Sequence, residues 1–194
     1  MNRGISKIKK FIKACLVLTG LNRIDFHKDN TFSVQPLILP VHRREELLCN
    51  LMLFFTGFSR IAGEIAKSKI VNMKNRKAEL LSIREMVDEA ITILNNSESK
   101  IEEFGKLLDE SWKYKRSLSD QVSTPEIDQI YEHAKSAGAI GGKILGAGGG
   151  GFMLLFVLPE NQSAVRERLK KLVHVPFKFD NSGSRVVVYQ PNGL

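Results

Sequence analysis

The residues best suited to chemistry in this chain are gathered in one glycine-rich stretch, residues 141–156. It contains seven glycines and one lysine, Lys143, and it continues into large apolar side chains from Phe152. Clustered glycines mark backbone with positive φ or backbone close to another group, and successive N–H groups in such a loop bind anions. The apolar run 152–158 predicts a buried strand that fixes the loop to a sheet. The stretch therefore predicts either a phosphate-contacting loop or a tight turn between strands.

Three standard phosphate loops do not fit this stretch. A Walker loop needs Ser or Thr after Gly-Lys, and here Ile144 follows Lys143. Gly146, Gly148 and Gly151 satisfy G-x-G-x-x-G, but the dinucleotide fingerprint opens a helix, whereas this stretch runs into a strand. The glycine loop of protein kinases is followed by Val-Ala-Ile-Lys, which is missing here.

Residues 143–152, Lys-Ile-Leu-Gly-Ala-Gly-Gly-Gly-Gly-Phe, resemble the C-terminal glycine-rich motif of the GHMP kinases. This family contains galactokinase, homoserine kinase, mevalonate kinase and phosphomevalonate kinase. Within it, the stretch is most similar to the sugar-kinase branch that phosphorylates D-glycero-D-manno-heptose 7-phosphate. The resemblance covers residues 20–189 and implies a ferredoxin-like C-terminal domain, ATP and Mg²⁺ as cofactors, and a sugar phosphate as substrate.

The resemblance also implies that the motif forms a loop against the nucleotide or the substrate phosphate. The glycines are expected to supply N–H groups and close approach. Lys143 is expected to contact phosphate or to form a salt bridge that holds the loop shut, because a lysine can do either. The implied loop residues are Lys143, Gly146, Ala147, Gly148, Gly149, Gly150 and Gly151.

A second candidate anion site follows the apolar run 51–55, which predicts a buried strand. The sequence Thr-Gly-Phe-Ser-Arg at 56–60 leads from it into a predicted helix. A turn at Gly57 before a helix N-terminus can bind an anion, and Arg60 can grip phosphate with two hydrogen bonds. The alternative is that Arg60 lies on a solvated helix face. A similar turn in the heptose kinases implies that Thr56, Gly57 and Arg60 border a substrate cleft.

Aromatic and basic residues alternate at 112–116, Trp-Lys-Tyr-Lys-Arg. Such clusters can stack on nucleic-acid bases, but five residues at a helix end are weak evidence for that function. Packing of Trp112 in the core, with the basic side chains in solvent, is the simpler interpretation. The heptose kinases have a similar Trp followed by Lys-Arg, which implies that Lys115 and Arg116 face the substrate cleft.

The chain has 194 residues, which is enough for one domain with its own hydrophobic core and at most a small additional segment. Its net charge is +8, but seven basic residues and a single acidic one, Asp25, lie within residues 1–28. The remaining chain has little excess charge and no nucleic-acid recognition motif, so no nucleic-acid partner is expected. The apolar stretch at 12–18 is interrupted by Lys13 and is too short to span a bilayer, so no membrane partner is expected.

Cys15 and Cys49 are too few for a disulfide framework and lack the spacing of a metal site. The four histidines are scattered singly along the chain, and no metal-binding residues are predicted. These features fit a reducing, cytoplasmic setting.

Apolar spacing and turn residues predict an α+β fold, with a mixed or antiparallel sheet covered on one face by helices. Ser123 and Glu126 predict a capping box that opens a helix ending near Gly138. Two further helices carry apolar stripes at 83–94 and 101–108, and another lies around 165–172. The expected strands are 22–28, 31–37, 51–55, 142–145, 152–158, 175–179 and 185–189.

We expect an unassigned basic segment at 1–19, remnant strands of an N-terminal kinase domain at 20–40, and a GHMP kinase C-terminal domain at 41–194. GHMP kinases bind ATP through a Pro-x-x-Gly-Leu-Gly-Ser-Ser-type loop in the N-terminal domain, and this sequence has no such loop. The resemblance therefore implies the C-terminal part of an ATP-dependent kinase that phosphorylates the anomeric hydroxyl of a heptose 7-phosphate. Alone it is expected to be inactive or nearly so, with its catalytic residues unassigned and a separate N-terminal kinase fragment as a candidate partner.

Two other functions remain open. The chain could be a non-catalytic ferredoxin-like module for ligand binding or assembly, in which the glycine loop is only a hinge. It could also belong to a GHMP kinase for another small substrate, such as galactose, mevalonate or homoserine.

Overall fold

The computed structural model describes residues 20–29, 31–58, 65, 68, 70–72 and 75–180. These residues fall into two compact units. The smaller unit comprises the described residues of 1–38 and 178–194, and the larger unit comprises those of 39–177.

The smaller unit contains an antiparallel hairpin of β1 (Asn22–Phe26) and β2 (Phe32–Pro36). Asp29 fixes its turn, because one carboxylate oxygen accepts hydrogen bonds from the Thr31 amide at 2.9 Å and the Thr31 hydroxyl at 2.7 Å. This local bonding is why Asp favours such turns. The predicted hairpin is confirmed. The Gly20 amide donates to the Asp180 carbonyl at 2.9 Å, which brings residue 180 into the same unit.

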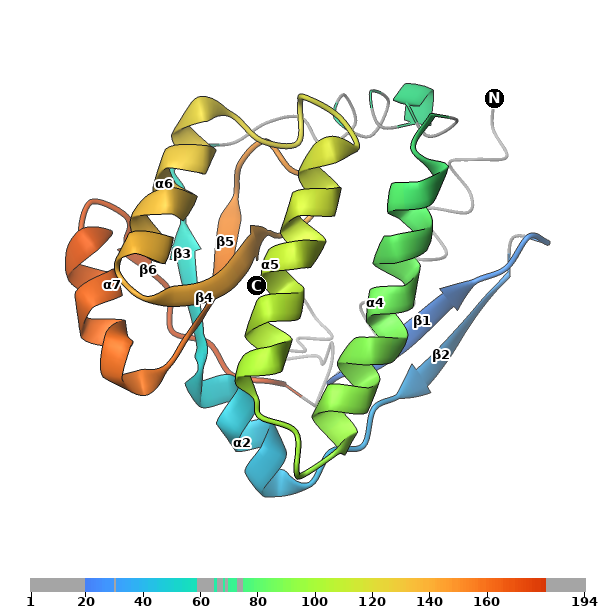
Figure 1. The fold of residues 1–194 in the computed structure, drawn as a ribbon, viewed down its shortest axis with the longest axis horizontal. Helices are drawn as coiled ribbons and strands as arrows, with labels where there is room; N and C mark the ends of the chain where they lie inside the picture. The colour runs from blue at the N-terminus through green and yellow to red at the C-terminus, as the bar shows by residue number, and fades with distance from the viewer. Residues whose placement is uncertain are drawn as a thin grey trace, which may run out of the picture. The chain divides into compact units, whose positions relative to one another are not determined.

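The larger unit is built on a four-stranded sheet in the order β4-β5-β3-β6 (Figure 1). Its strands are β3 (Leu51–Phe55), β4 (Ala139–Ile144), β5 (Phe152–Val157) and β6 (Val173–His174), and every neighbouring pair is antiparallel. The first strand along the chain lies between the third and the fourth. This order, with helices after the first and third strands, is the ferredoxin-like arrangement. The predicted α+β class is confirmed.

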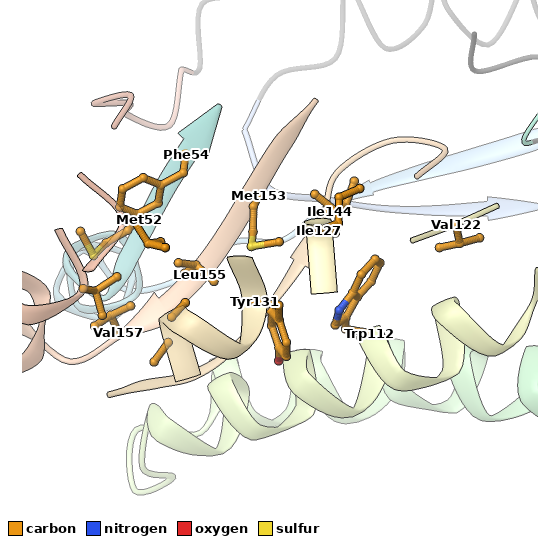
Figure 2. Packing of buried hydrophobic residues seen from close by; sticks show 14 of the residues in the cluster. Met52, Phe54, Trp112, Val122, Ile127, Tyr131, Ile144, Met153, Leu155 and Val157 are labelled. Atoms are coloured by element: carbon orange, nitrogen blue, oxygen red, sulfur yellow. The ribbon is translucent and has the colours of Figure 1, made fainter. Parts of the chain in front are cut away.

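Alternation along the strands sends one set of apolar side chains into the main core, because successive residues of a strand point to opposite faces. Met52 and Phe54 on β3 and Met153, Leu155 and Val157 on β5 are at most 1% exposed. Figure 2 shows these side chains with Trp112, Ile127, Tyr131 and Ile144, which belong to the same cluster.

The described part of the larger unit also contains five helices. Helix α5 packs on β4 and against α4, and α6 also packs on β4 (Figure 1). Helix α7 follows the 3-10 turn Pro159–Asn161 and packs on α6. The helices are α2 (Val41–Cys49), α4 (Lys77–Asn95), α5 (Glu102–Ser117), α6 (Pro125–Ser136) and α7 (Gln162–Arg168).

Helix α5 approaches β4 so closely that glycine is needed at the contact. A Cβ placed on Gly141 of β4 would lie 2.1 Å from the Gly105 carbonyl oxygen of α5 and 2.8 Å from the Asp109 backbone nitrogen. A Cβ on Gly105 would lie 2.5 Å from the ring of Phe156. The missing side chains therefore let the helix backbone lie directly on the edge strand.

Asp109 joins α5 to α6 beside this contact. Its carboxylate accepts a hydrogen bond from the hydroxyl of Tyr131 and forms ion pairs with Lys113 at 2.7 Å and Lys135 at 3.5 Å. Burial by itself would raise the pKa of Asp109, but the hydrogen bonds from Lys113 and Tyr131 and the Lys135 charge outweigh it, so this pKa is lowered. The carboxylate is thus ionised and fully partnered, as a structural group should be.

Three predicted boundaries are wrong, each for a local reason. The cap of α6 is Thr124, whose hydroxyl accepts from the Ile127 amide, because Pro125 takes the first helical position. Strand β4 starts at Ala139, since glycines with low strand propensity hide its first half. No strand is found at 175–179. The last strand of this sheet is Val173–His174 and ends before Pro176, which cannot donate a ladder hydrogen bond. The strand expected at 185–189 lies outside the described residues.

We expect Gly141→Ala to destabilise the chain by about 3 kcal/mol or more, since its methyl group would collide with backbone atoms that cannot rotate away. Gly105→Ala is the matched comparison and should cost less, since its methyl group meets the side chain of Phe156 rather than backbone and also gains about 1 kcal/mol in helix propensity. Urea unfolding followed by circular dichroism measures both. Equal losses of unfolding free energy in the two variants would contradict this expectation, because they would mean that the α5 backbone shifts to make room for the methyl group at position 141.

Candidate functional site

The loop between β4 and β5 depends on its glycines. Their φ angles range from +72° to +150°, a region that residues with a Cβ rarely adopt, and the glycines concerned are Gly146, Gly148, Gly149, Gly150 and Gly151. A Cβ on Gly148 would lie 2.7 Å from the Val122 carbonyl oxygen, and one on Gly150 would lie 2.6 Å from that of Phe58. The loop is therefore constrained both by its backbone conformation and by close neighbours.

Two neighbouring segments hold the loop through backbone hydrogen bonds. The Gly149 amide donates to the Val122 carbonyl and the Gly151 amide to the Phe58 carbonyl, both at 2.8 Å. The Thr56 amide and hydroxyl each donate to the Gly151 carbonyl at 2.9 Å. Two of the amides expected to meet phosphate are thus used within the protein. The loop is preorganised, rather than an open row of donors.

Thr56 is 2% exposed and serves to anchor the end of the loop. The next residue, Gly57, has a φ of +79° and open space around its Cβ position, so it supplies the turn after β3. The third residue predicted for this turn, Arg60, lies outside the described residues.

Lys115 holds the other end of the loop. Its ammonium group donates to the Ile144 carbonyl at 2.7 Å and the Gly146 carbonyl at 2.9 Å. The same nitrogen lies 5.9 Å from the centre of the Trp112 ring, within cation–π range. The structure thus directs this charge at the loop's own carbonyls.

Arg116, the other cation expected in a cleft, connects α5 to α6. Its guanidinium donates to the Asp128 carboxylate at 3.0 Å and lies 5.7 Å from the Trp112 ring centre. The same Asp128 oxygen accepts from the Ser123 hydroxyl at 2.7 Å. Trp112 itself is completely buried, as the sequence predicted.

Lys143 differs from these two cations. It is half-buried on β4, and its ammonium group donates to the Ser111 hydroxyl at 3.1 Å. Burial lowers the pKa of Lys143, because a low-dielectric environment disfavours the charged form. Within the part of the chain that the structure describes, no carboxylate forms an ion pair with it. The alternative of a loop-closing salt bridge therefore finds no partner among those residues.

Sequence reasoning missed three groups that shape this site: Ser111, Val122 and Phe58. Ser111 precedes Trp112 by one residue and positions Lys143 through a hydrogen bond across the helix–strand contact. Val122 and Phe58 contribute only backbone carbonyls to the loop, so their residue types carry no signal of this role. The only hint of a role for Ser111 in the sequence was its position next to Trp112 in the same helix.

No group of His, Cys, Asp and Glu within the described residues could hold a metal ion. Among the helices that are described, none combines the length and apolar character needed to cross a membrane.

Residues 82–175 match the sequence model of the family described as GHMP kinases C terminal. This region contains α5, α6, the glycine loop and three of the four strands of the larger sheet. The chain carries a C-terminal domain of the GHMP kinase family. The family resemblance of the glycine-rich motif is confirmed.

The similar characterised proteins are kinases for several small substrates. The chain is 30% identical over 153 residues to the D-glycero-alpha-D-manno-heptose 7-phosphate kinase of Campylobacter jejuni, a match covering 78% of this chain and 45% of that protein. Over 89 residues it is 42% identical to the mevalonate kinase of Thermococcus gammatolerans, covering 44% of this chain and 26% of that protein. The chain thus spans less than half the length of these relatives.

Solved structures share the fold. The L. major mevalonate kinase with R-mevalonate has a TM-score of 0.62 at 16% identity, covering 80% of this chain and 48% of that one. A D-glycero-D-manno-heptose 1-phosphate kinase from Bacteroides thetaiotaomicron has a TM-score of 0.61 at 21% identity, covering 87% of this chain and 45% of that one. At these identities, the likeness shows a common fold.

Replacing Lys115 and Lys143 separately should have different effects on stability. Lys115→Met removes charged hydrogen bonds to two loop carbonyls and should cost about 1–3 kcal/mol. Lys143→Met removes a desolvated charge for which the described residues offer no carboxylate partner, and the free energy of unfolding should be unchanged or slightly higher. Urea unfolding of the two variants tests this ordering. A larger loss for Lys143→Met would mean that Lys143 is a structural group.

The lowered pKa of Lys143 predicts a pH dependence of stability. Between that pKa and the ordinary value of 10.5, the unfolded chain binds more protons at this site than the folded chain. Stability of the wild type should therefore rise with pH relative to Lys143→Met in this alkaline window. Thermal unfolding of both proteins across this pH window measures the difference in their stability. The other lysines are the same in both proteins, so their contribution cancels. A constant difference would contradict burial of the charged group.

Proposed function

We propose that this chain is the C-terminal part of an ATP-dependent sugar kinase that phosphorylates the anomeric hydroxyl of a heptose 7-phosphate. The observation that carries the proposal is Lys143, a half-buried cation beside a preorganised glycine loop, without a carboxylate partner among the described residues. An anionic phosphate is the ligand that such a cation lacks. The proposed kinase works in the cytoplasm, where ATP is available.

The chemistry of phosphoryl transfer suits this arrangement. The transferred group carries its charge on peripheral oxygens, and proteins catalyse its transfer mainly by positioning and by electrostatic stabilisation. Here Lys143 supplies one positive charge, and Ser111 orients it by accepting a hydrogen bond. Thr56 and Lys115 hold the loop in place, so its backbone would not need to rearrange when a phosphate binds beside it.

The proposal of a heptose 7-phosphate substrate is supported by the Campylobacter jejuni relative, which shares 30% identity over 78% of this chain. A phosphorylated sugar presents an anion distant from the reacting hydroxyl, so its site needs a cation beyond those that hold ATP. Lys143 is our candidate for one of these phosphate contacts. Arg60, which lies outside the described residues, is the second.

ATP is the proposed phosphoryl donor, in line with a related phosphomevalonate kinase whose structure contains phosphomevalonate and AMPPNP. Mg²⁺ would accompany ATP and neutralise phosphate charge. The described residues do not fit a Mg²⁺ site of their own, because no suitable cluster of ligating side chains occurs among them. The ligands of the nucleotide and of the metal are therefore proposed to lie in another part of the kinase.

A mevalonate kinase is the second candidate. The Thermococcus gammatolerans mevalonate kinase is 42% identical over 89 residues, a higher identity over a shorter match. The distinguishing property is charge: mevalonate bears a carboxylate, whereas heptose 7-phosphate bears a phosphate with up to two negative charges. Recognition of the sugar phosphate should therefore depend more strongly on a cation such as Lys143.

The first functional test uses the 194-residue chain alone and mixed with the N-terminal half of the Campylobacter jejuni relative. With ATP, Mg²⁺ and D-glycero-D-manno-heptose 7-phosphate, ³¹P NMR should show no product from the chain alone and an anomeric phosphate from the mixture. Lys143→Met should lower kcat/KM for the heptose phosphate by about tenfold or more, the loss of one charged phosphate contact. Lys113→Met, at an exposed lysine of α5, is the control and should leave it unchanged.

Different outcomes separate the candidate functions. Phosphorylation of mevalonate in preference to the heptose phosphate would replace the proposed substrate. Binding of the sugar phosphate without any transfer in the mixture would favour a non-catalytic ligand-binding module. Transfer by the chain alone would overturn the proposal that its catalytic groups are incomplete.

A further inference from the structure

The start of the glycine loop surrounds a cation with carbonyl oxygens and an aromatic ring. The Lys115 ammonium group donates to the Ile144 carbonyl at 2.7 Å and the Gly146 carbonyl at 2.9 Å, and it lies 5.9 Å from the centre of the Trp112 ring. Carbonyl oxygens bind potassium in proteins, and the faces of aromatic rings bind ammonium ions. The two carbonyls and the indole ring therefore form a site for a monovalent cation, called the cation cradle below. Lys115 fills it from within the chain.

The cation in the cradle orients two peptide units. A trans peptide unit points its C=O and N–H groups in opposite directions, so a group that binds a carbonyl also directs the next amide. The Ile144 carbonyl faces Lys115, and the Leu145 amide faces the other way, where it donates to the Phe152 carbonyl at 2.8 Å. The Gly146 carbonyl also faces Lys115, which turns the amide of residue 147 to the opposite side of its peptide unit.

The peptide unit after Gly146 needs such a constraint because steric contact does not supply one. A Cβ on Gly148 or Gly150 would collide with a carbonyl oxygen of a neighbouring segment, whereas a Cβ on Gly146 would meet no described atom within 4 Å. Gly151 is equally open, but backbone hydrogen bonds hold both its N–H and its C=O. Glycine adopts φ angles of either sign, so the unit after Gly146 can turn over at little steric cost. Turning it over would present an N–H group to the Lys115 ammonium in place of a carbonyl.

We propose that Lys115 is a positioning residue of the kinase: a built-in monovalent cation that selects the orientation of the 146–147 peptide unit and does not touch the substrate. The inference rests on the proposed function. It gives Lys115 an action through the loop, in place of the substrate contact that the family resemblance implies. Phosphoryl transfer depends on how the groups around the phosphate are placed. Loss of the cation should therefore slow the transfer step more than it weakens substrate binding.

Chemical rescue tests the cradle on the 194-residue chain alone. Lys115→Ala removes the side chain beyond Cβ, which n-propylammonium matches in length and charge. Thermal unfolding should show a loss of about 4 °C or more in Tm. Propylammonium chloride should restore at least about half of that loss, compared with sodium chloride at equal ionic strength, because it binds the folded state of the variant. Lys113→Ala, at an exposed lysine of the same helix, is the matched control and should gain nothing from propylammonium.

Two further substitutions decide the question if Lys115→Ala does not fold or if its cavity collapses. Lys115→Arg keeps a positive charge at the cradle, and Lys115→Met keeps the apolar part of the side chain without the charge. The Arg variant should retain most of the wild-type Tm. The Met variant should lose about as much as the Ala variant and gain nothing from propylammonium, because its side chain fills the channel.

Three results of thermal unfolding would overturn the inference. One is a Lys115→Ala chain with the wild-type Tm, and another is an equal Tm for the Arg and Met variants. The third is an equal gain from propylammonium in Lys115→Ala, Lys115→Met and Lys113→Ala, which would be a general effect of the salt.

Kinetics test the positioning role, in the mixture with the N-terminal half of the Campylobacter jejuni relative. Lys115→Ala should lower kcat for heptose 7-phosphate by about tenfold or more and change KM by less than about threefold, and propylammonium should restore kcat. A raised KM with an unchanged kcat would overturn the inference, because it would mean that Lys115 contacts the substrate itself. Unchanged kcat and KM would overturn it as well.

The inference and the proposed function can fail separately. If the wild-type mixture transfers no phosphate but propylammonium restores the Tm of Lys115→Ala, the cradle is supported and the proposed reaction is rejected. If the mixture is active and Lys115→Ala transfers phosphate at the wild-type rate, the proposed reaction is supported and the positioning role is rejected.

Discussion

The contact between α5 and β4 is the constraint on which the described site depends. Because neither Gly105 nor Gly141 has a side chain, the helix backbone lies directly on the edge strand. This approach lets α5 present three side chains with different roles: Ser111 to Lys143, Trp112 to the core, and Lys115 to the carbonyls of Ile144 and Gly146. A helix displaced by one methyl group would lose these contacts together, since cores repack poorly around backbone shifts.

The glycine loop is a rigid element rather than a flexible one. Carbonyls of Val122 and Phe58 accept from its amides, Thr56 anchors its end, and Lys115 holds its start. Nearly every group that fixes the loop comes from a different part of the chain. In a site that works by positioning, such bracing sets the geometry before a ligand arrives. Among the described residues Lys143 has no carboxylate partner, and we propose that it contacts an external anion.

Much of the fold was predictable because apolar periodicity reports burial. The run 51–55 and the run from Phe152 are strands, and the apolar stripes around Ile83 and Ile101 lie on α4 and α5. Predictions failed where local chemistry competes with that signal. Pro125 moved a helix cap by one residue, glycines concealed the start of β4, and Pro176 ended β6 after Val173–His174. These errors concern single hydrogen bonds, which periodicity does not report.

The sequence by itself determined the family motif, the α+β class and the positions of the candidate cations, because these depend on residue type and spacing. Only the tertiary structure decided what each cation does. Lys115, Arg116 and Lys143 look alike in the sequence, but one faces loop carbonyls, one faces Asp128 and one faces a serine hydroxyl. The bracing of the loop by Val122 and Phe58 was equally hidden, since both act through backbone carbonyls. A side chain's role is set by its partners, and long-range folding chooses them.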